Sequence, residues 1–133
     1  MPRLGEKLPD VDRGLATLIE DLDLRGLLET TLVVVTGEFG RTPKFNENAG
    51  RDHWSNAFSV LLAGGGVKGG TSYGATDDFG HKVVENPVSV HDFHATILHL
   101  LGLHHQKLFF KRNGLEERLT GFEPPRVVKE ILT

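Results

Sequence analysis

The segment that decides the fold is TTLVVVT, residues 30–36. Because it carries β-branched and apolar residues at consecutive positions, it predicts a strand that is covered on both faces. Residues 10–29 before it predict a helix, with Asp10 or Asp12 as its cap and Gly26 as its end or a bend. The apolar residues that recur there at helical spacing are Leu15, Leu18, Ile19 and Leu22. A helix that leads directly into a doubly buried strand is typical of an α/β sheet.

Three further elements follow along the chain. Residues 57–63 predict a second buried strand, and residues 91–101 predict a helix that Gly102 closes. Residues 125–132 predict a short helix with a proline in its first turn. The connection 37–56 has no apolar periodicity, and connections of that length without regular structure are usually functional or disordered.

Composition excludes several classes of protein. The 133 residues include 15 Lys+Arg and 18 Asp+Glu, a formal net charge of −3, which argues against nucleic-acid binding. The absence of cysteine excludes disulfides, thiolate zinc sites and cysteine nucleophiles. No apolar run approaches the roughly 18 residues of a membrane span, and the first residues lack the apolar stretch of a signal peptide.

The small number of strands suggests a larger sheet. Two or three buried strands cannot cover both of their faces or close their own edges. We therefore interpret residues 1–133 as a single domain that is a fragment of a larger α/β domain.

Residues 64–70, GGGVKGG, predict a flexible glycine segment after the second strand. They match Gly-x-Gly-x-x-Gly loosely, but no helix pattern follows, so we exclude a dinucleotide-binding loop. They also lack the Gly-Lys-Ser/Thr end of a Walker A loop.

The segment GEFGRTP, residues 37–43, leaves the first strand at the end where α/β sheets bind ligands. Glu38 supplies an oxygen ligand or a base, and Arg41 supplies a planar set of donors for an oxyanion. The alternative, which this motif alone leaves equally weighted, is an ion pair between Glu38 and Arg41 that holds a turn.

Asp52 and His53 place a carboxylate beside an imidazole. A metal such as zinc accepts this oxygen and nitrogen pair, and the imidazole can also act as a general acid or base. The two side chains converge only if the backbone turns there. The alternative is a surface dipeptide, with Trp54 anchoring the loop in the core.

His91 and His94 lie three residues apart at the start of the helix 91–101, a spacing that suits two ligands of one metal. In the alternative, His91 caps the helix and His94 is a hydrogen-bonded boundary residue. His81 and the pair Asp77-Asp78 are further candidate ligands. The pair His104-His105 is expected in a solvent-exposed loop.

Two stretches resemble a known superfamily. Residues 31–40, TLVVVTGEFG, are similar to the TLVVFTSDHG strand and loop of sulfatases and related phosphohydrolases. Residues 91–103, HDFHATILHLLGL, resemble the superfamily's DIAPTLLDLLGL helix. The closer resemblance is to the C-terminal third of a sulfatase-like bacterial family, domain of unknown function 1501. The segments that carry it are 37–43, 50–53, 63–70, 73–80, 84–103, 118–120 and 127–132.

The resemblance implies the C-terminal part of a doubly wound, alkaline-phosphatase/sulfatase-like mixed sheet with flanking helices and long loops. It further implies a metal-dependent hydrolase of sulfate or phosphate esters, whose nucleophile and further acidic ligands come from an N-terminal part. Glu38 and Phe39 stand where the superfamily has two metal ligands, Asp and Asn or His. His94 stands where its helix usually has proline. Exported or periplasmic localisation is suggested by this resemblance alone.

The leading hypothesis assigns Arg41 and His53 as catalytic residues. Divalent-metal ligands (zinc, calcium or magnesium) come from Glu38, Asp52, His53, His91 and His94. The isolated chain is expected to have little or no activity, because the nucleophile is missing. The alternative is a non-catalytic interaction or scaffold domain, in which a partner chain or a second copy covers the sheet edges.

Overall fold

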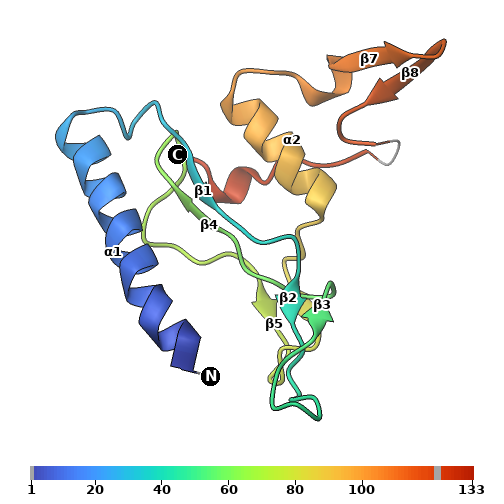
Figure 1. Cartoon of the computed structure of the whole chain (residues 1–133). Helices are drawn as coiled ribbons and strands as arrows, with labels where there is room; N and C mark the ends of the chain where they lie inside the picture. Colours follow the sequence, from blue (N-terminus) through green and yellow to red (C-terminus); the bar gives the residue numbers. More distant parts are fainter. Residues whose placement is uncertain (1, 122–123) are drawn as a thin grey trace.

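The computed structural model describes residues 2–121 and 124–133. The described residues form two α-helices, eight short strands and two 3₁₀ turns, so the expected mixture of helix and strand is confirmed (Figure 1). The elements are α1 (Pro2–Leu24), β1 (Val33–Val35), β2 (Gly40–Arg41), β3 (His53–Trp54), β4 (Leu61–Ala63), β5 (Ala75–Thr76), β6 (Val83–Glu85), α2 (Val90–Leu100), η1 (His105–Lys107), β7 (Phe109–Arg112), β8 (Leu115–Arg118) and η2 (Lys129–Ile131). Among the described residues, no helix is long and apolar enough to cross a membrane.

Helix α1 starts earlier than its apolar pattern indicates. It begins at Pro2 and continues through Pro9, so neither Asp10 nor Asp12 caps it. Residues 5–14 are exposed along their whole length, so no apolar stripe marks this part of the helix. The end at Gly26 is confirmed: Gly26 has φ +67°, and the N–H of Leu27 donates to Leu22 O (2.8 Å).

Helix α2 is capped by Ser89 and not by His91. The Ser89 hydroxyl accepts from the N–H of Asp92, and the Asp92 carboxylate accepts from the N–H of Ser89 (3.0 Å each), which is a capping box. The helix closes at Gly102, as predicted, with φ +74°. The N–H of Leu103 donates to the carbonyl of Leu98 (2.8 Å).

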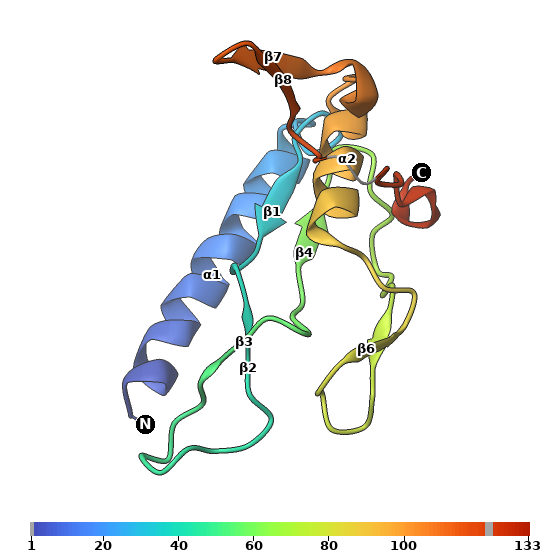
Figure 2. The ribbon, with the colours of Figure 1, turned by 90° about the vertical axis from the view of Figure 1, so that its right-hand side faces the viewer.

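The described strands form four two-stranded antiparallel sheets: β1–β4, β2–β3, β5–β6 and β7–β8. A doubly wound sheet is not formed by these residues alone. The prediction that residues 30–36 form a strand covered on both faces is wrong, since Val34 and Val35 of β1 are 36% and 40% exposed. Among the described strands β1 pairs only with β4, and α1 runs alongside (Figure 2), so part of the surface of β1 stays open.

The expected flexible glycine segment is an ordered turn. Gly64, Gly65 and Gly66 all have positive φ (73°, 56° and 88°), a backbone region that residues with side chains rarely adopt. The N–H of Gly65 donates to Leu28 O (2.9 Å), and the N–H of Thr133 donates to Gly66 O (3.0 Å). This glycine turn, residues 64–66, therefore joins the α1–β1 connection to the C-terminal segment.

The C-terminal segment closes the small core instead of forming the predicted helix. Val128 (1% exposed) is buried, as are Ala95 and Thr96 of α2. The Thr96 hydroxyl accepts from the N–H of Val128 (3.0 Å). Leu132 pairs with Val67 in an isolated β-bridge, so only a 3₁₀ turn remains where the helix was expected.

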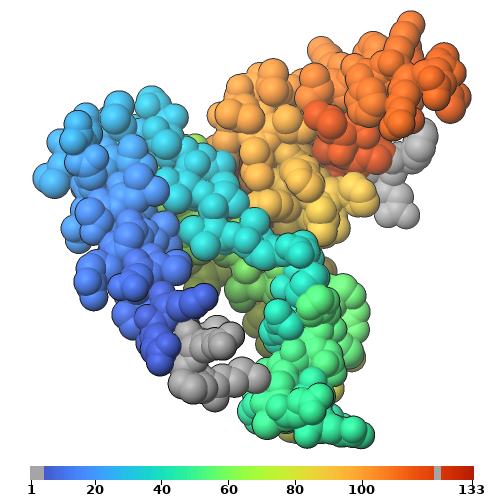
Figure 3. All heavy atoms as spheres, viewed as in Figure 1, coloured from blue at the N-terminus to red at the C-terminus, as the bar shows by residue number. Residues whose placement is uncertain are grey.

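Two parts of the chain project from this body in the space-filling view (Figure 3). One is the β7–β8 hairpin, whose residues are almost all exposed. The other lies around residues 43–51, between β2 and β3.

Replacing Gly64 by alanine should strongly destabilise the fold. Its Cβ would collide with the carbonyl oxygens of Leu28 and Thr31, and its φ of +73° adds backbone strain. We expect a loss of at least about 2 kcal/mol in the free energy of unfolding, measured by urea denaturation of the full chain. Gly69→Ala is the control, since nothing lies within 4 Å of its added Cβ, and it should change stability by less than about 0.5 kcal/mol. Equal midpoints for the two variants would contradict the role assigned to the glycine turn.

Candidate functional site

The connection 37–56 contains a short antiparallel ladder rather than an irregular loop. Strands β2 and β3 pair Gly40 with Trp54 and Arg41 with His53. The N–H of Thr42 extends the ladder by donating to the carbonyl of Asp52 (3.0 Å). The ladder thus places the two predicted catalytic residues, Arg41 and His53, directly opposite each other.

Because Gly40 has no side chain, strand β2 can lie against the backbone of Ala57, just after β3. A Cβ at this position would overlap the carbonyl oxygen of Ala57 and lie 3.2 Å from that of Trp54. Only glycine therefore allows the backbone to approach this closely, and any larger residue would push β2 away from residue 57.

Phe39 holds the two candidate catalytic side chains. Its ring stacks on the His53 imidazole with centroids 3.8 Å apart and an interplanar angle of 25°. The Arg41 guanidinium lies 5.6 Å from the centroid of the same ring, within the range of a cation–π contact. Arg41 also donates from Nη1 to the Arg51 carbonyl (3.2 Å). An aromatic ring at the position where the resembling superfamily has a metal ligand therefore orients both an arginine and a histidine.

Hydrogen bonds hold Asp52, whereas ring stacking holds its neighbour His53. The Oδ1 of Asp52 accepts from the amide of Asn46 (2.8 Å), and the N–H of Asp52 donates to the Thr42 hydroxyl (3.1 Å). Because the backbone is extended here, consecutive side chains point to opposite faces of the ladder. The turn that convergence of Asp52 and His53 requires is not present.

Glu38 and Trp54, on either side of the ladder in sequence, differ in how they are held. Glu38 is exposed in the bend between β1 and β2, and no ion pair joins it to Arg41 among the described residues. Trp54 is half-buried, and its Nε1–H donates to the carbonyl of His81 (2.8 Å). Trp54 therefore ties the ladder to the turn before β6, where Asp77 Oδ1 accepts from the N–H of His81 (2.7 Å).

The two candidate histidines of α2 lie on a different element. The Nδ1 of His94 is 2.9 Å from the carbonyl oxygen of Val90, so this nitrogen donates and Nε2 remains for another partner. His91 lies against Gly121, where an added Cβ would come within 3.2 Å of its Nε2.

The candidate metal ligands do not gather into one group. Within residues 2–121 and 124–133, no three His, Asp or Glu side chains come together in a way that could hold a metal ion. The described residues therefore do not fit a complete metal site. The assignment of Glu38, Asp52, His53, His91 and His94 as ligands stays a prediction.

The family assignment rests on a match over nearly the whole chain. The family described as "Protein of unknown function (DUF1501)" matches residues 2–132. The chain belongs to the DUF1501 family. No curated protein and no solved structure was found to match it.

Sequence reasoning missed one polar cluster of this DUF1501 protein, centred on Asp92 and Arg126. The N–H of Arg126 donates to Asp92 Oδ1 (2.7 Å), and its guanidinium contacts the Tyr73 hydroxyl and the Glu130 carboxylate (3.2 Å each). The i, i+4 spacing of Arg126 and Glu130 is visible in the sequence, but no local pattern links either residue to α2.

These contacts shift the pKa of Asp92. Partial burial acts to raise this pKa, but the hydrogen bonds from the backbone of Arg126 and Ser89 and the positive charge of Arg126 outweigh it. The pKa of the Asp92 carboxyl is therefore held below its usual value. The ionised carboxylate links the start of α2 to the C-terminal segment.

The variant Asp92→Asn should destabilise the DUF1501 chain by about 1 kcal/mol, because it weakens the capping box and the bond to Arg126. Because the folded-state pKa of Asp92 is lowered, its stabilisation is present above the ordinary aspartate pKa of about 4 and is lost as the pH falls through the lower folded value. The difference from wild type in urea midpoint should therefore shrink as the pH falls below about 4.

Asp78→Asn is the matched control, since Asp78 is exposed in the turn before β6. Its midpoint should follow that of the wild type at every pH. A pH-independent difference for Asp92→Asn would contradict the assigned role of the ionised carboxylate.

Proposed function

We propose that this chain is the C-terminal portion of a sulfatase-like, metal-dependent hydrolase of sulfate or phosphate esters, built on a doubly wound sheet. The observation that carries the proposal is the pairing of Arg41 with His53 across β2 and β3, with Phe39 stacked on the imidazole. Support also comes from the position of this ladder, which follows the end of β1, where α/β enzymes place their ligands.

The chemistry of the ladder suits an oxyanion. Arg41 carries a planar guanidinium with five N–H donors, a geometry that matches two oxygens of a sulfate or phosphate group. His53 can take or give a proton at the ester, and its stacking on Phe39 restricts the ring orientation. Both side chains are exposed and so accessible to a ligand.

The nucleophile and the remaining acidic ligands belong, in this proposal, to polypeptide outside these 133 residues. Zinc, calcium or magnesium would be held by that part together with a share of ligands from Glu38 and His53, while Asp52, on the opposite face and bonded to Asn46, would join them only after the ladder rearranges. His91 and His94 are second-rank ligands. Hydrolysis by the isolated chain should be very low, since losing an essential nucleophile removes several orders of magnitude in rate.

An NMR titration of the full chain tests the proposal with two probes. Zinc should shift the resonances of Glu38, Asp52 and His53, and inorganic sulfate should shift those of Arg41. His53→Ala should weaken the binding of both probes, zinc by at least about tenfold, because the imidazole takes part in both interactions.

Glu47→Ala and Lys44→Ala are matched controls, since each removes an exposed charge from the same connection. Both should leave the affinities of wild type unchanged. Affinities that stay the same in His53→Ala would overturn the proposal.

A second candidate, the interaction or scaffold domain, is favoured by the open surface of the β1–β4 sheet. Val34, Val35 and Leu61 are 36%, 40% and 46% exposed on strands that have no third partner among the described residues. Exposed apolar side chains beside unpaired strand edges are typical of a surface that a second chain covers.

If a second copy covers this sheet, sedimentation velocity should show a chain that self-associates as its concentration rises. Val35→Lys places a charge in the apolar surface and should leave the chain monomeric. Val84→Lys, on an exposed position of β6, is the control and should still self-associate. A wild-type chain that stays monomeric at every concentration would argue against this candidate.

A further inference from the structure

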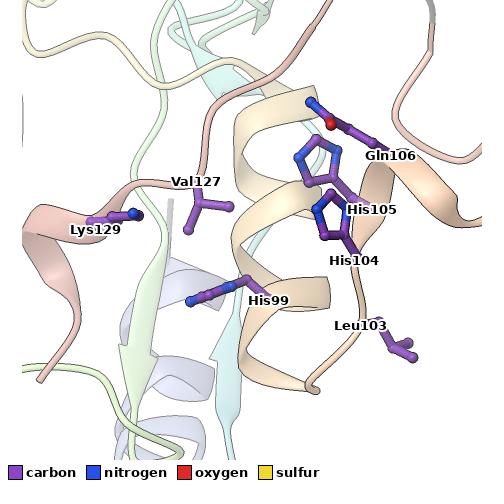
Figure 4. A pocket seen from close by; sticks show the side chains of 7 residues that line it. All are labelled: His99, Leu103, His104, His105, Gln106, Val127 and Lys129. Atoms are coloured by element: carbon purple, nitrogen blue, oxygen red, sulfur yellow. The ribbon is translucent and has the colours of Figure 1, made fainter.

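A pocket lined by histidines lies at the end of α2, and no residue of the β2–β3 ladder lines it (Figure 4). Its volume is about 320 Å³. Its walls come from the last turn of α2, the segment leading into η1, and the C-terminal segment. The lining residues are His99, Leu103, His104, His105, Gln106, Val127 and Lys129.

The turn at Gly102 builds one wall. With φ +74° this glycine ends α2 and sends the chain back, so that His104 and His105 follow close to His99. The imidazoles of His104 and His105 stack with centroids 5.9 Å apart and an interplanar angle of 19°.

His105 is buried and forms one wall of the pocket, so the predicted solvent-exposed loop at His104-His105 is wrong for this residue. It is 7% exposed, and its Nδ1 lies 3.4 Å from the hydroxyl of the buried Thr120. His104 and His99 are exposed and can reach a ligand. On the opposite side, the buried Val128 fixes Val127 and Lys129 at the rim.

The polar groups of the pocket favour an anion. Three imidazoles, the Lys129 ammonium and the Gln106 amide can donate hydrogen bonds, and no Asp or Glu is among the lining residues. Glu130, next to Lys129 in the sequence, pairs with Arg126 (3.2 Å). Leu103 and Val127 add an apolar surface.

We propose that this pocket binds a small organic anion. Its sulfate, phosphate or carboxylate group would be held by His99, His104 and Lys129, and its apolar body would lie against Leu103 and Val127. The volume suits a ligand of one ring and one charged group better than a bare inorganic ion.

Benzenesulfonate is a suitable probe, because it joins one apolar ring to one negatively charged sulfonate group. In an NMR titration of the full chain, saturable shifts should centre on His99, His104 and Lys129. Lys129→Ala should weaken binding about fivefold, the effect of losing one exposed charged contact. His104→Ala should also weaken binding, because it removes one of the proposed hydrogen-bond donors.

Lys107→Ala is the matched control, because it removes one exposed positive charge from η1 without touching the pocket lining. It should bind benzenesulfonate as the wild type does. Equal losses in Lys107→Ala and Lys129→Ala would mean attraction by overall charge and would overturn the proposal. Benzyl alcohol that binds as tightly as benzenesulfonate would also overturn it, since the anionic group would then contribute nothing.

Discussion

The close backbone approach at the glycine turn, residues 64–66, is the constraint on which the rest of the structure depends. Gly64 and Gly65 lie against the backbone at Leu28 and Leu32, and Gly66 bonds to the C-terminal residue Thr133 (3.0 Å). One short turn thus holds α1, the β1–β4 pair and the C-terminal segment together. Because few side chains are fully buried, backbone hydrogen bonds carry a large part of this connection.

The candidate site also depends on a close backbone approach at a glycine. Gly40 lets β2 approach Ala57, and the ladder it begins fixes Arg41 opposite His53. Rigidity comes from contacts between neighbours in the ladder, where the Phe39 ring contacts both polar side chains. The site therefore combines an ordered backbone with accessible side chains, an arrangement that suits ligand binding.

Local signals in the sequence predicted some features of the structure and not others. Gly26 and Gly102 end helices because a positive φ is a property of glycine itself, so both ends were predictable. The exposure of Val35 was not predictable, because it depends on which elements lie beside β1. At the candidate site, Arg41 and His53 were recognised as candidates from their chemistry. Their direct pairing was not predictable, because it depends on the register of β2 and β3. The partner of Asp52, Asn46, lies in a loop that has no periodic pattern.

The bond from Trp54 to the carbonyl of His81 has an optical consequence. Trp54 is the only tryptophan in the 133 residues, so all indole emission from the chain reports on one place. That place is next to His53 in β3, where the indole also meets the ring of His81 edge-on at 5.9 Å. A ligand that reorders the ladder would change the surroundings of the indole, and the chain thus carries its own fluorescent label beside the candidate site.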